Sequence, residues 1–194
     1  MRSGRAVLLI LALLLPGAGL AAPAVSPASD PPALGVFIPA APQPAPKISF
    51  SNAAGQKFKL ADFAGRVVIV NLWATWCAPC RREMPSLERL QARLGDKITI
   101  LAISEDTRGE KAVAPFVAKL GLKAIKTYLD PTSAVGQAFK VDGLPSSFVL
   151  DRNGRVVGRV VGEAKWDSPK MLAVIDPLLG EGEVVKTSFP PKHP

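Results

Sequence analysis

Both cysteines of the 194-residue chain lie in one short segment, WATWCAPCRREMP, at residues 73–85. Cys77 and Cys80 are separated only by Ala78 and Pro79. Two residues three apart on a helix share a face, so their sulfurs can form a disulfide that opens and closes with little backbone movement. The spacing therefore predicts a redox-active cysteine pair.

The place of this pair on a helix gives the two sulfurs different roles. We expect a helix over residues 77–94 that puts Cys77 at its first turn, where Pro79 is tolerated because its missing N–H is not needed. Unpaired N–H groups and about half a positive charge at a helix N-terminus favour a thiolate. Cys77 is therefore the expected attacking sulfur. Cys80, facing into the fold, would resolve the mixed disulfide.

Three other interpretations of the pair compete with redox exchange. A structural disulfide that closes so small a loop would contribute only roughly 2 kcal/mol. A zinc or copper site needs more ligands, and the single histidine, His193, lies close to the C-terminus. A peroxidatic cysteine of the peroxiredoxin kind would follow a threonine by three residues, where this chain has Ala74. We favour exchange and predict neither a metal nor a cofactor.

The elements around the pair follow an alternating pattern. RVVIVNLW, at 66–73, is apolar at nearly every position and β-branched, which is typical of a strand covered on both faces. Residues 47–65 predict two short strands around an Asn-Ala-Ala-Gly turn. The remaining expected elements are strands at 98–104, 127–130, 146–151 and 155–161 and helices at 110–120, 133–139 and 169–179. The pattern predicts an α/β fold with a mixed sheet flanked by helices.

The two ends of the chain differ from its middle. Arg2 and Arg5 precede an apolar run and then small residues, so residues 1–22 are expected to be a signal peptide or an uncleaved membrane anchor. Residues 23–46 are rich in proline and are expected to form a linker without regular structure. One domain is expected over 47–180, and a flexible tail over 181–194.

The net charge of +8 does not indicate nucleic acid binding. Basic residues are scattered among acids and form no run with interleaved aromatics. A basic protein surface explains the charge, and we expect no nucleic acid partner.

A second segment extends the predicted site. In Leu144-Pro145-Ser146-Ser147-Phe148 a proline stands at the head of a strand. Together with the upstream strand, Cys-x-x-Cys and helix, it resembles the thioredoxin superfamily. VNLWATWCAPCRREMPSLERL, GLPSSFVLDRNGRVVGRVVG and EAKWDSP are similar to the TlpA and ResA branch of that superfamily, most of all to its TlpA members. The resemblance extends from Lys47 to Leu179.

This resemblance implies a thioredoxin-like fold with an added N-terminal β-hairpin and a cis peptide bond before Pro145. It also implies that the Leu144 backbone meets an extended substrate by strand addition. Trp76 and Pro79 are expected at the docking surface, whereas Trp73 is expected to pack beneath it. Trp166 matches a late tryptophan of the family, for which the sequence suggests no role.

One departure from cytoplasmic thioredoxins concerns the buried acid six residues before the first cysteine, which is Asn71 here. Glu83 matches an acid that the exported branch carries near its disulfide. It could accept the proton of Cys80, with a pKa raised by partial burial. The alternative is a surface glutamate paired with arginines.

The resemblance implies an exported, periplasmic protein disulfide reductase. By similarity to TlpA, its targets would be copper-site cysteines of cytochrome oxidase assembly, in a Sco-type copper chaperone or oxidase subunit II. By similarity to ResA, the target would be apocytochrome c. A membrane thiol transporter of the DsbD or CcdA type would supply electrons. A disulfide oxidase or isomerase and a non-catalytic chaperone or copper-binding module are the alternatives.

Overall fold

The central strand of the fold is the apolar segment that precedes the cysteines. In the computed structural model, which describes residues 35–180, this segment forms β4 (Val67–Trp73), and every one of its residues is buried. β4 runs parallel to β5 (Ile98–Ser104) and antiparallel to β7 (Ser146–Leu150). A strand with neighbours on both sides and layers on both faces has no polar side, which explains its composition.

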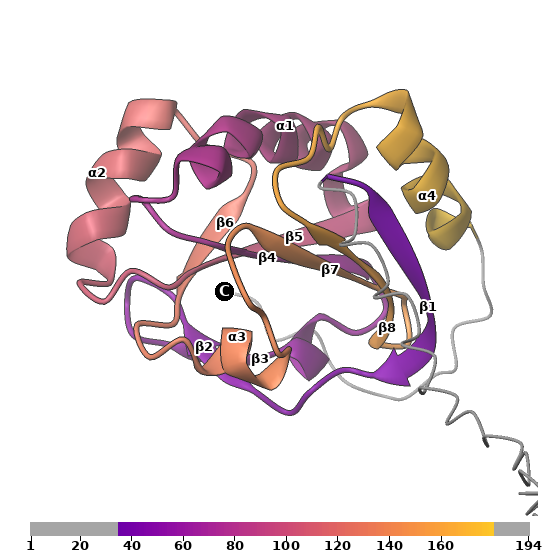
Figure 1. Cartoon of the computed structure of the whole chain (residues 1–194), viewed down its shortest axis with the longest axis horizontal. Helices are drawn as coiled ribbons and strands as arrows, with labels where there is room; N and C mark the ends of the chain where they lie inside the picture. Colours follow the sequence, from indigo (N-terminus) through magenta and orange to yellow (C-terminus); the bar gives the residue numbers. More distant parts are fainter. Residues whose placement is uncertain (1–34, 181–194) are drawn as a thin grey trace, which may run out of the picture. The chain divides into compact units, whose positions relative to one another are not determined.

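The complete sheet has eight strands in the order β1-β8-β7-β4-β5-β6-β2-β3 (Figure 1). The strands not yet given are β1 (Phe37–Pro44), β2 (Ser49–Ser51), β3 (Lys57–Lys59), β6 (Lys126–Leu129) and β8 (Arg155–Val161). The sheet contains parallel pairs, β4 with β5 and β5 with β6, and antiparallel pairs, β4 with β7 and β7 with β8, so the expectation of a mixed sheet is confirmed.

Two hydrophobic layers cover the sheet. Helices α1 (Ala78–Leu94), α2 (Glu110–Leu120) and α4 (Pro169–Leu179) lie on one face, and α3 (Ala134–Ala138) lies on the other (Figure 1). Along β4, Val67 and Ile69 belong to the first layer, whereas Val68 and Val70 belong to the second. Because side chains alternate along a strand, Asn71 is on the face that α1 covers.

Helix α1 begins and ends at the residues that the sequence predicts. Cys77 is its N-cap, Pro79 lies in its first turn, and Gly95 ends it with a positive φ of 54°. Its buried stripe includes Met84, Leu87 and Leu90, together with two residues of different chemistry, Cys80 and Glu83. The buried face of α1 therefore carries a cysteine and a carboxylate into the first layer.

The added hairpin is present. β2 and β3 pair antiparallel, and Ser51 of β2 pairs with Leu129 of β6, which joins the hairpin to that edge of the sheet. Aromatic rings from these elements pack together at 5.1–6.4 Å between centroids: Phe50, Phe58, Phe63 and Tyr128. The aromatic cluster holds the hairpin to the second layer.

The prediction of an unstructured linker through residue 46 is wrong for residues 37–44. They form β1, which pairs antiparallel with β8, so that Phe37 is opposite Val160 and Ile38 opposite Arg159. Prolines fit an edge strand because their missing N–H need not join a ladder. The domain therefore begins at least ten residues before Lys47.

The other terminal predictions, the signal or anchor at 1–22, the linker over 23–34 and the tail at 181–194, lie outside the described residues. Within residues 35–180, no helix is both long and apolar enough to cross a membrane.

Candidate active site

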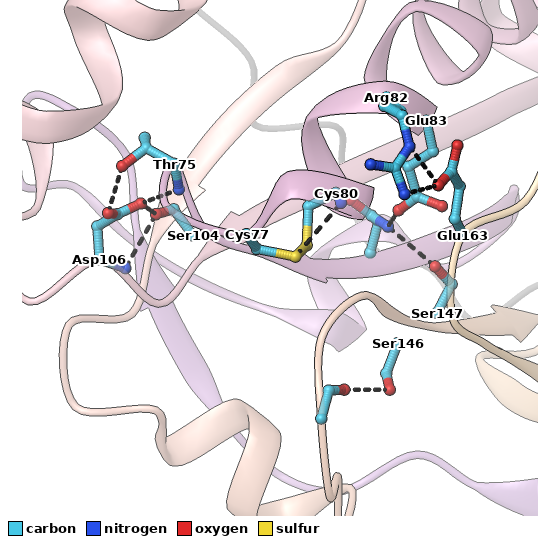
Figure 2. Close-up of a disulfide and its surroundings, with 12 residues drawn as sticks. Thr75, Cys77, Cys80, Arg82, Glu83, Ser104, Asp106, Ser146, Ser147 and Glu163 are labelled. Carbon is cyan, nitrogen blue, oxygen red and sulfur yellow. Dashed lines mark hydrogen bonds and ion pairs between the residues drawn. A yellow bond between two sulfur atoms is a disulfide. The ribbon is translucent and has the colours of Figure 1, made fainter.

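The two cysteines form a disulfide at the N-terminus of α1, with Cα atoms 5.3 Å apart (Figure 2). Cys77 caps the helix, and its Sγ accepts a hydrogen bond from the Cys80 N–H at 3.3 Å. Cys77 is 6% exposed and Cys80 is fully buried. Cys77 is thus the more accessible of the two cysteines, and its sulfur is the one that helix N–H groups would stabilise as a thiolate.

A metal site is not formed around the pair. In the part of the chain that the structure describes, no three His, Cys, Asp or Glu side chains cluster in a way that could hold a metal ion. The cysteines are paired with each other instead.

The turn that carries Trp76 and Cys77 is held by a buried aspartate at the end of β5. Asp106 accepts hydrogen bonds from the Thr75 N–H at 2.8 Å, from the Thr75 hydroxyl at 2.7 Å and from the Ser104 hydroxyl at 2.8 Å. Figure 2 shows this group beside the disulfide. The sequence interpretation missed Asp106, although parallel strands place the ends of β4 and β5 at one edge of the sheet.

Trp76 is the single large hydrophobic side chain that stands exposed among the described residues, at 69%. Trp73 is fully buried and packs against Phe116 of α2 at 5.3 Å between ring centroids. The two tryptophans thus lie where the sequence places them, one at the surface next to Cys77 and one in the core.

The loop before β7 has the expected cis peptide bond, between Leu144 and Pro145. The Pro145 carbonyl accepts a hydrogen bond from the Gly162 N–H at 2.9 Å, and the Ser146 hydroxyl donates to the Gly143 carbonyl at 2.7 Å. These bonds fix the backbone of the loop and leave it facing a groove.

This groove, of about 890 Å³, lies between α1 and two loops. Pro79 and Arg82 line it from α1, Leu144 and Pro145 from the loop before β7, and residues 161–165 from the end of β8. Arg82 is paired with Glu163 across the groove, with 2.6 Å between Nη2 and Oε2. The groove brings three of the predicted docking residues together, Pro79, Leu144 and Pro145.

Glu83 does not lie on the surface, so the interpretation as an exposed, arginine-paired glutamate is wrong. It is 2% exposed and lies three residues after Cys80 on the buried face of α1. Its Oε1 accepts from the Asn71 side-chain amide at 2.7 Å, and its Oε2 from the Ala164 N–H at 3.1 Å and the Trp166 indole N–H at 3.4 Å. Burial raises its pKa to about 7, against the effect of these three donors.

Asn71 links Glu83 to the neighbouring strand. Its amide nitrogen also donates to the Ser147 hydroxyl at 2.9 Å, while its Oδ1 is buried without a hydrogen-bond partner among residues 35–180. A polar side chain in the middle of an otherwise apolar strand is the sequence signal for this site. The sequence reveals the departure at Asn71 but not its contact with Glu83.

This arrangement can perform thiol-disulfide exchange. It combines the more accessible sulfur of Cys77 at a helix N-terminus, a buried partner sulfur and a buried carboxyl group one helical turn from that partner. A carboxyl group whose pKa lies near neutral pH can accept and return a proton.

Known proteins agree with the fold and with the cysteine pair. The Redoxin family matches residues 40–175. The thiol-disulfide oxidoreductase ResA of Bacillus anthracis is 35% identical over 120 residues, which are 61% of this chain and 68% of the relative. The expected thioredoxin-like fold and its thiol-disulfide oxidoreductase type are confirmed.

Two solved structures are similar over most of their length. A putative thiol:disulfide interchange protein DsbE from Chlorobium tepidum has a TM-score of 0.65 and 30% identity and covers 72% of this chain and 97% of that one. A secreted thiol-disulfide isomerase from Corynebacterium glutamicum has a TM-score of 0.66 and 28% identity and covers 79% of this chain and 96% of that one.

Proposed function

Because the chain belongs to the Redoxin family, as a thiol-disulfide oxidoreductase of the ResA and DsbE type, we propose that it is an exported reductase of protein disulfides. The observation that carries this proposal is the difference between its two cysteines: Cys77 is the N-cap of α1 and keeps 6% exposure, whereas Cys80 is fully buried on the α1 face that also holds Glu83.

The first step uses Cys77. Its thiolate attacks one sulfur of the target disulfide, whose S–S bond breaks as a mixed disulfide with Cys77 forms. The second target sulfur leaves as a thiolate and takes up a proton. The N–H of Cys80, which already donates to Cys77 Sγ, supports negative charge on the attacking sulfur.

The second step uses Cys80 and Glu83. The Cys80 thiol gives its proton to the Glu83 carboxylate, and its sulfur attacks the sulfur of Cys77. The internal disulfide forms as the bond between Cys77 and the target breaks, and the target sulfur leaves as a thiolate that takes up a proton. Both side chains lie on the buried face of α1, where few other groups could take this proton. A pKa of about 7 suits a group that must accept a proton at neutral pH and later release it.

Substrate docking uses the groove and the exposed indole. Trp76 offers an apolar surface next to Cys77, and Pro79, Leu144 and Pro145 line the groove beside it. The Leu144 backbone would pair with an extended segment of the target, as an added strand does. Together they would hold the target disulfide over the sulfur of Cys77.

Export to the periplasm is supported by the signal-like residues 1–22, and a similar protein from Corynebacterium glutamicum is described as secreted. An oxidising compartment needs reductants only for chosen targets. We propose copper-site cysteines of a Sco-type copper chaperone or cytochrome oxidase subunit II as targets, with apocytochrome c as the second candidate that ResA resemblance favours. A DsbD- or CcdA-type membrane transporter would return the electrons.

The decisive experiment is to express the Cys80→Ser protein in its native host and identify what stays bound through Cys77. We expect disulfide-linked target proteins that dithiothreitol releases, and none from the matched Cys77→Ser variant. Capture of apocytochrome c alone would replace copper-site assembly as the role. Insulin reduction that survives in Cys77→Ser would overturn the reductase function, and a redox potential near about −120 mV would indicate an oxidase instead.

A further inference from the structure

The loop between β8 and α4 is fastened to α1 at several points. Ser86 of α1 accepts a hydrogen bond from the Trp166 backbone N–H at 3.1 Å, and its hydroxyl donates to the Glu83 carbonyl of the same helix at 2.7 Å. Arg82 and Arg89 of α1 pair with Glu163 and Asp167 of the loop, each at 2.6 Å. The loop therefore has a fixed position relative to the helix that carries Cys80 and Glu83.

Two groups of this loop converge on one oxygen of Glu83. The Ala164 N–H and the Trp166 indole N–H both donate to Oε2, while Asn71 of β4 donates to Oε1. Trp166 is only 1% exposed, so its indole N–H has no access to solvent. Most buried indole N–H groups have a hydrogen-bond partner, and for Trp166 the partner is the carboxyl group of Glu83, one helical turn after Cys80.

We propose that Trp166 is a positioning residue for thiol-disulfide exchange: its indole N–H holds the Glu83 carboxylate in place at the resolving cysteine. This inference rests on the proposed function of Glu83 as the proton acceptor of Cys80. It gives the late tryptophan of the chain a physical role that its position in the sequence does not suggest.

The hydrogen bond from Trp166 stabilises the ionised form of Glu83 more than the protonated form. An N–H donor favours the ionised carboxylate, so the Trp166 indole lowers the pKa of Glu83, against the larger effect of burial. The charged neighbour from the loop is Glu163, which raises that pKa and is itself paired with Arg82. On the other elements, β4 and β7 contribute the neutral Asn71 and Ser147, and α1 contributes Cys80.

The test is Trp166→Phe, which keeps an aromatic ring and removes the N–H. The matched control is Trp73→Phe, because Trp73 is equally buried but its indole N–H has no hydrogen-bond partner among the described residues. Titration of the Glu83 carboxyl carbon by NMR in the full-length oxidised protein reports the effect directly. We expect the Glu83 midpoint to rise by about half a pH unit in Trp166→Phe and to stay unchanged in Trp73→Phe.

A second measurement connects this effect to the reaction. The pH profile for reduction of a disulfide peptide should move to higher pH in Trp166→Phe by the same amount, whereas a merely structural loss would lower the rate at every pH. If the phenylalanine variant does not fold, 3-benzothienylalanine at position 166 removes the N–H and keeps the ring shape.

Each outcome decides the proposal. Equal midpoints in the wild type and Trp166→Phe, or equal shifts in Trp166→Phe and Trp73→Phe, would overturn the positioning role. Failure of the proposed function looks different: Glu83→Gln would then reduce disulfides with an unchanged pH profile, although Trp166→Phe still moved the NMR midpoint.

Discussion

The side-chain amide of Asn71 donates to Oε1 of Glu83 at 2.7 Å, which joins the centre of the sheet to the buried face of α1. Neither residue is exposed. The contact brings a carboxyl group into the layer that contains Cys80, and it does so through a neutral donor instead of a basic side chain. The pH dependence of stability should therefore reflect the ionisation of Glu83.

The stability of the oxidised protein should fall as the pH rises through the range in which Glu83 ionises. Its pKa is raised from 4.5 to about 7, so between these values the unfolded chain loses a proton that the folded chain keeps. The contribution is therefore most favourable below about pH 4.5 and is lost by about pH 7, on the order of 3 kcal/mol in all. Glu83→Gln should lack this decline.

Urea unfolding of the wild type and of Glu83→Gln at a series of pH values measures the effect. The difference between the two free energies of unfolding should change in favour of the variant as the pH rises from about 4.5 to about 7.5. A constant difference over that range would show that Glu83 ionises normally in the folded protein.

Asn71→Asp should destabilise the protein most at alkaline pH. The substitution places a second carboxylate at hydrogen-bond distance from Glu83. Ionisation of both carboxylates in one buried site is strongly unfavourable. We expect a loss on the order of 3 kcal/mol at about pH 8 and a clearly smaller loss at about pH 5. Asn71→Leu removes the donor without adding a charge. Urea unfolding should therefore show a weaker pH dependence of the loss for Asn71→Leu than for Asn71→Asp.

Asp106→Asn should weaken substrate binding as well as stability. Asp106 accepts three hydrogen bonds, two of them from Thr75 in the turn before Cys77 and one from Ser104. A neutral amide has only one acceptor oxygen, so it cannot replace the carboxylate in all three. We expect about 1–3 kcal/mol of lost stability and a raised KM for a disulfide peptide.

The control for this effect is Asp130→Asn. Asp130 is also buried and also accepts a backbone N–H and a hydroxyl, but it holds the start of α3 instead of the turn at the cysteines. The Asp130→Asn variant should lose stability with little change in KM. Equal KM values in the two variants would argue against a role of Asp106 in substrate docking.

Alkylation of the reduced protein should distinguish the two sulfurs. Cys77, at the helix N-terminus, keeps 6% exposure, whereas Cys80 has none. Iodoacetamide at about pH 7 should label Cys77 at least about tenfold faster than Cys80, which mass spectrometry of the labelled peptides can quantify. Similar labelling rates would contradict the assignment of Cys77 as the attacking sulfur.

Gly158→Ala should destabilise the domain through β1. A Cβ at this position would collide with the Phe37 ring and come within 2.7 Å of the Ile38 carbonyl oxygen. Overpacking of this kind costs about 1–3 kcal/mol. The cost, measured by urea unfolding, should be smaller in a Phe37→Ala background. No cost in either background would mean that residues 37–44 are not packed on β8 in solution.

Local patterns predicted much of this protein. The apolar run of β4, the spacing of Cys77 and Cys80 and the helix that follows them are visible in consecutive residues, because strand and helix periodicities are properties of short segments. The groups that act on Glu83 could not be predicted in this way. Ala164 and Trp166 are 81 and 83 residues away from it, and nothing in the local sequence records which loop packs on α1.

By itself, the sequence determined that a cysteine pair stands at the head of a helix after a buried strand, with a proline-led strand later in the chain. Only the tertiary structure decided that Glu83 is buried, that Asn71 and Trp166 contact it, and that residues 37–44 join the sheet as β1. The physical reason is that burial, and the pKa that depends on it, come from the packing of elements distant in sequence, whereas spacing and periodicity belong to a single element.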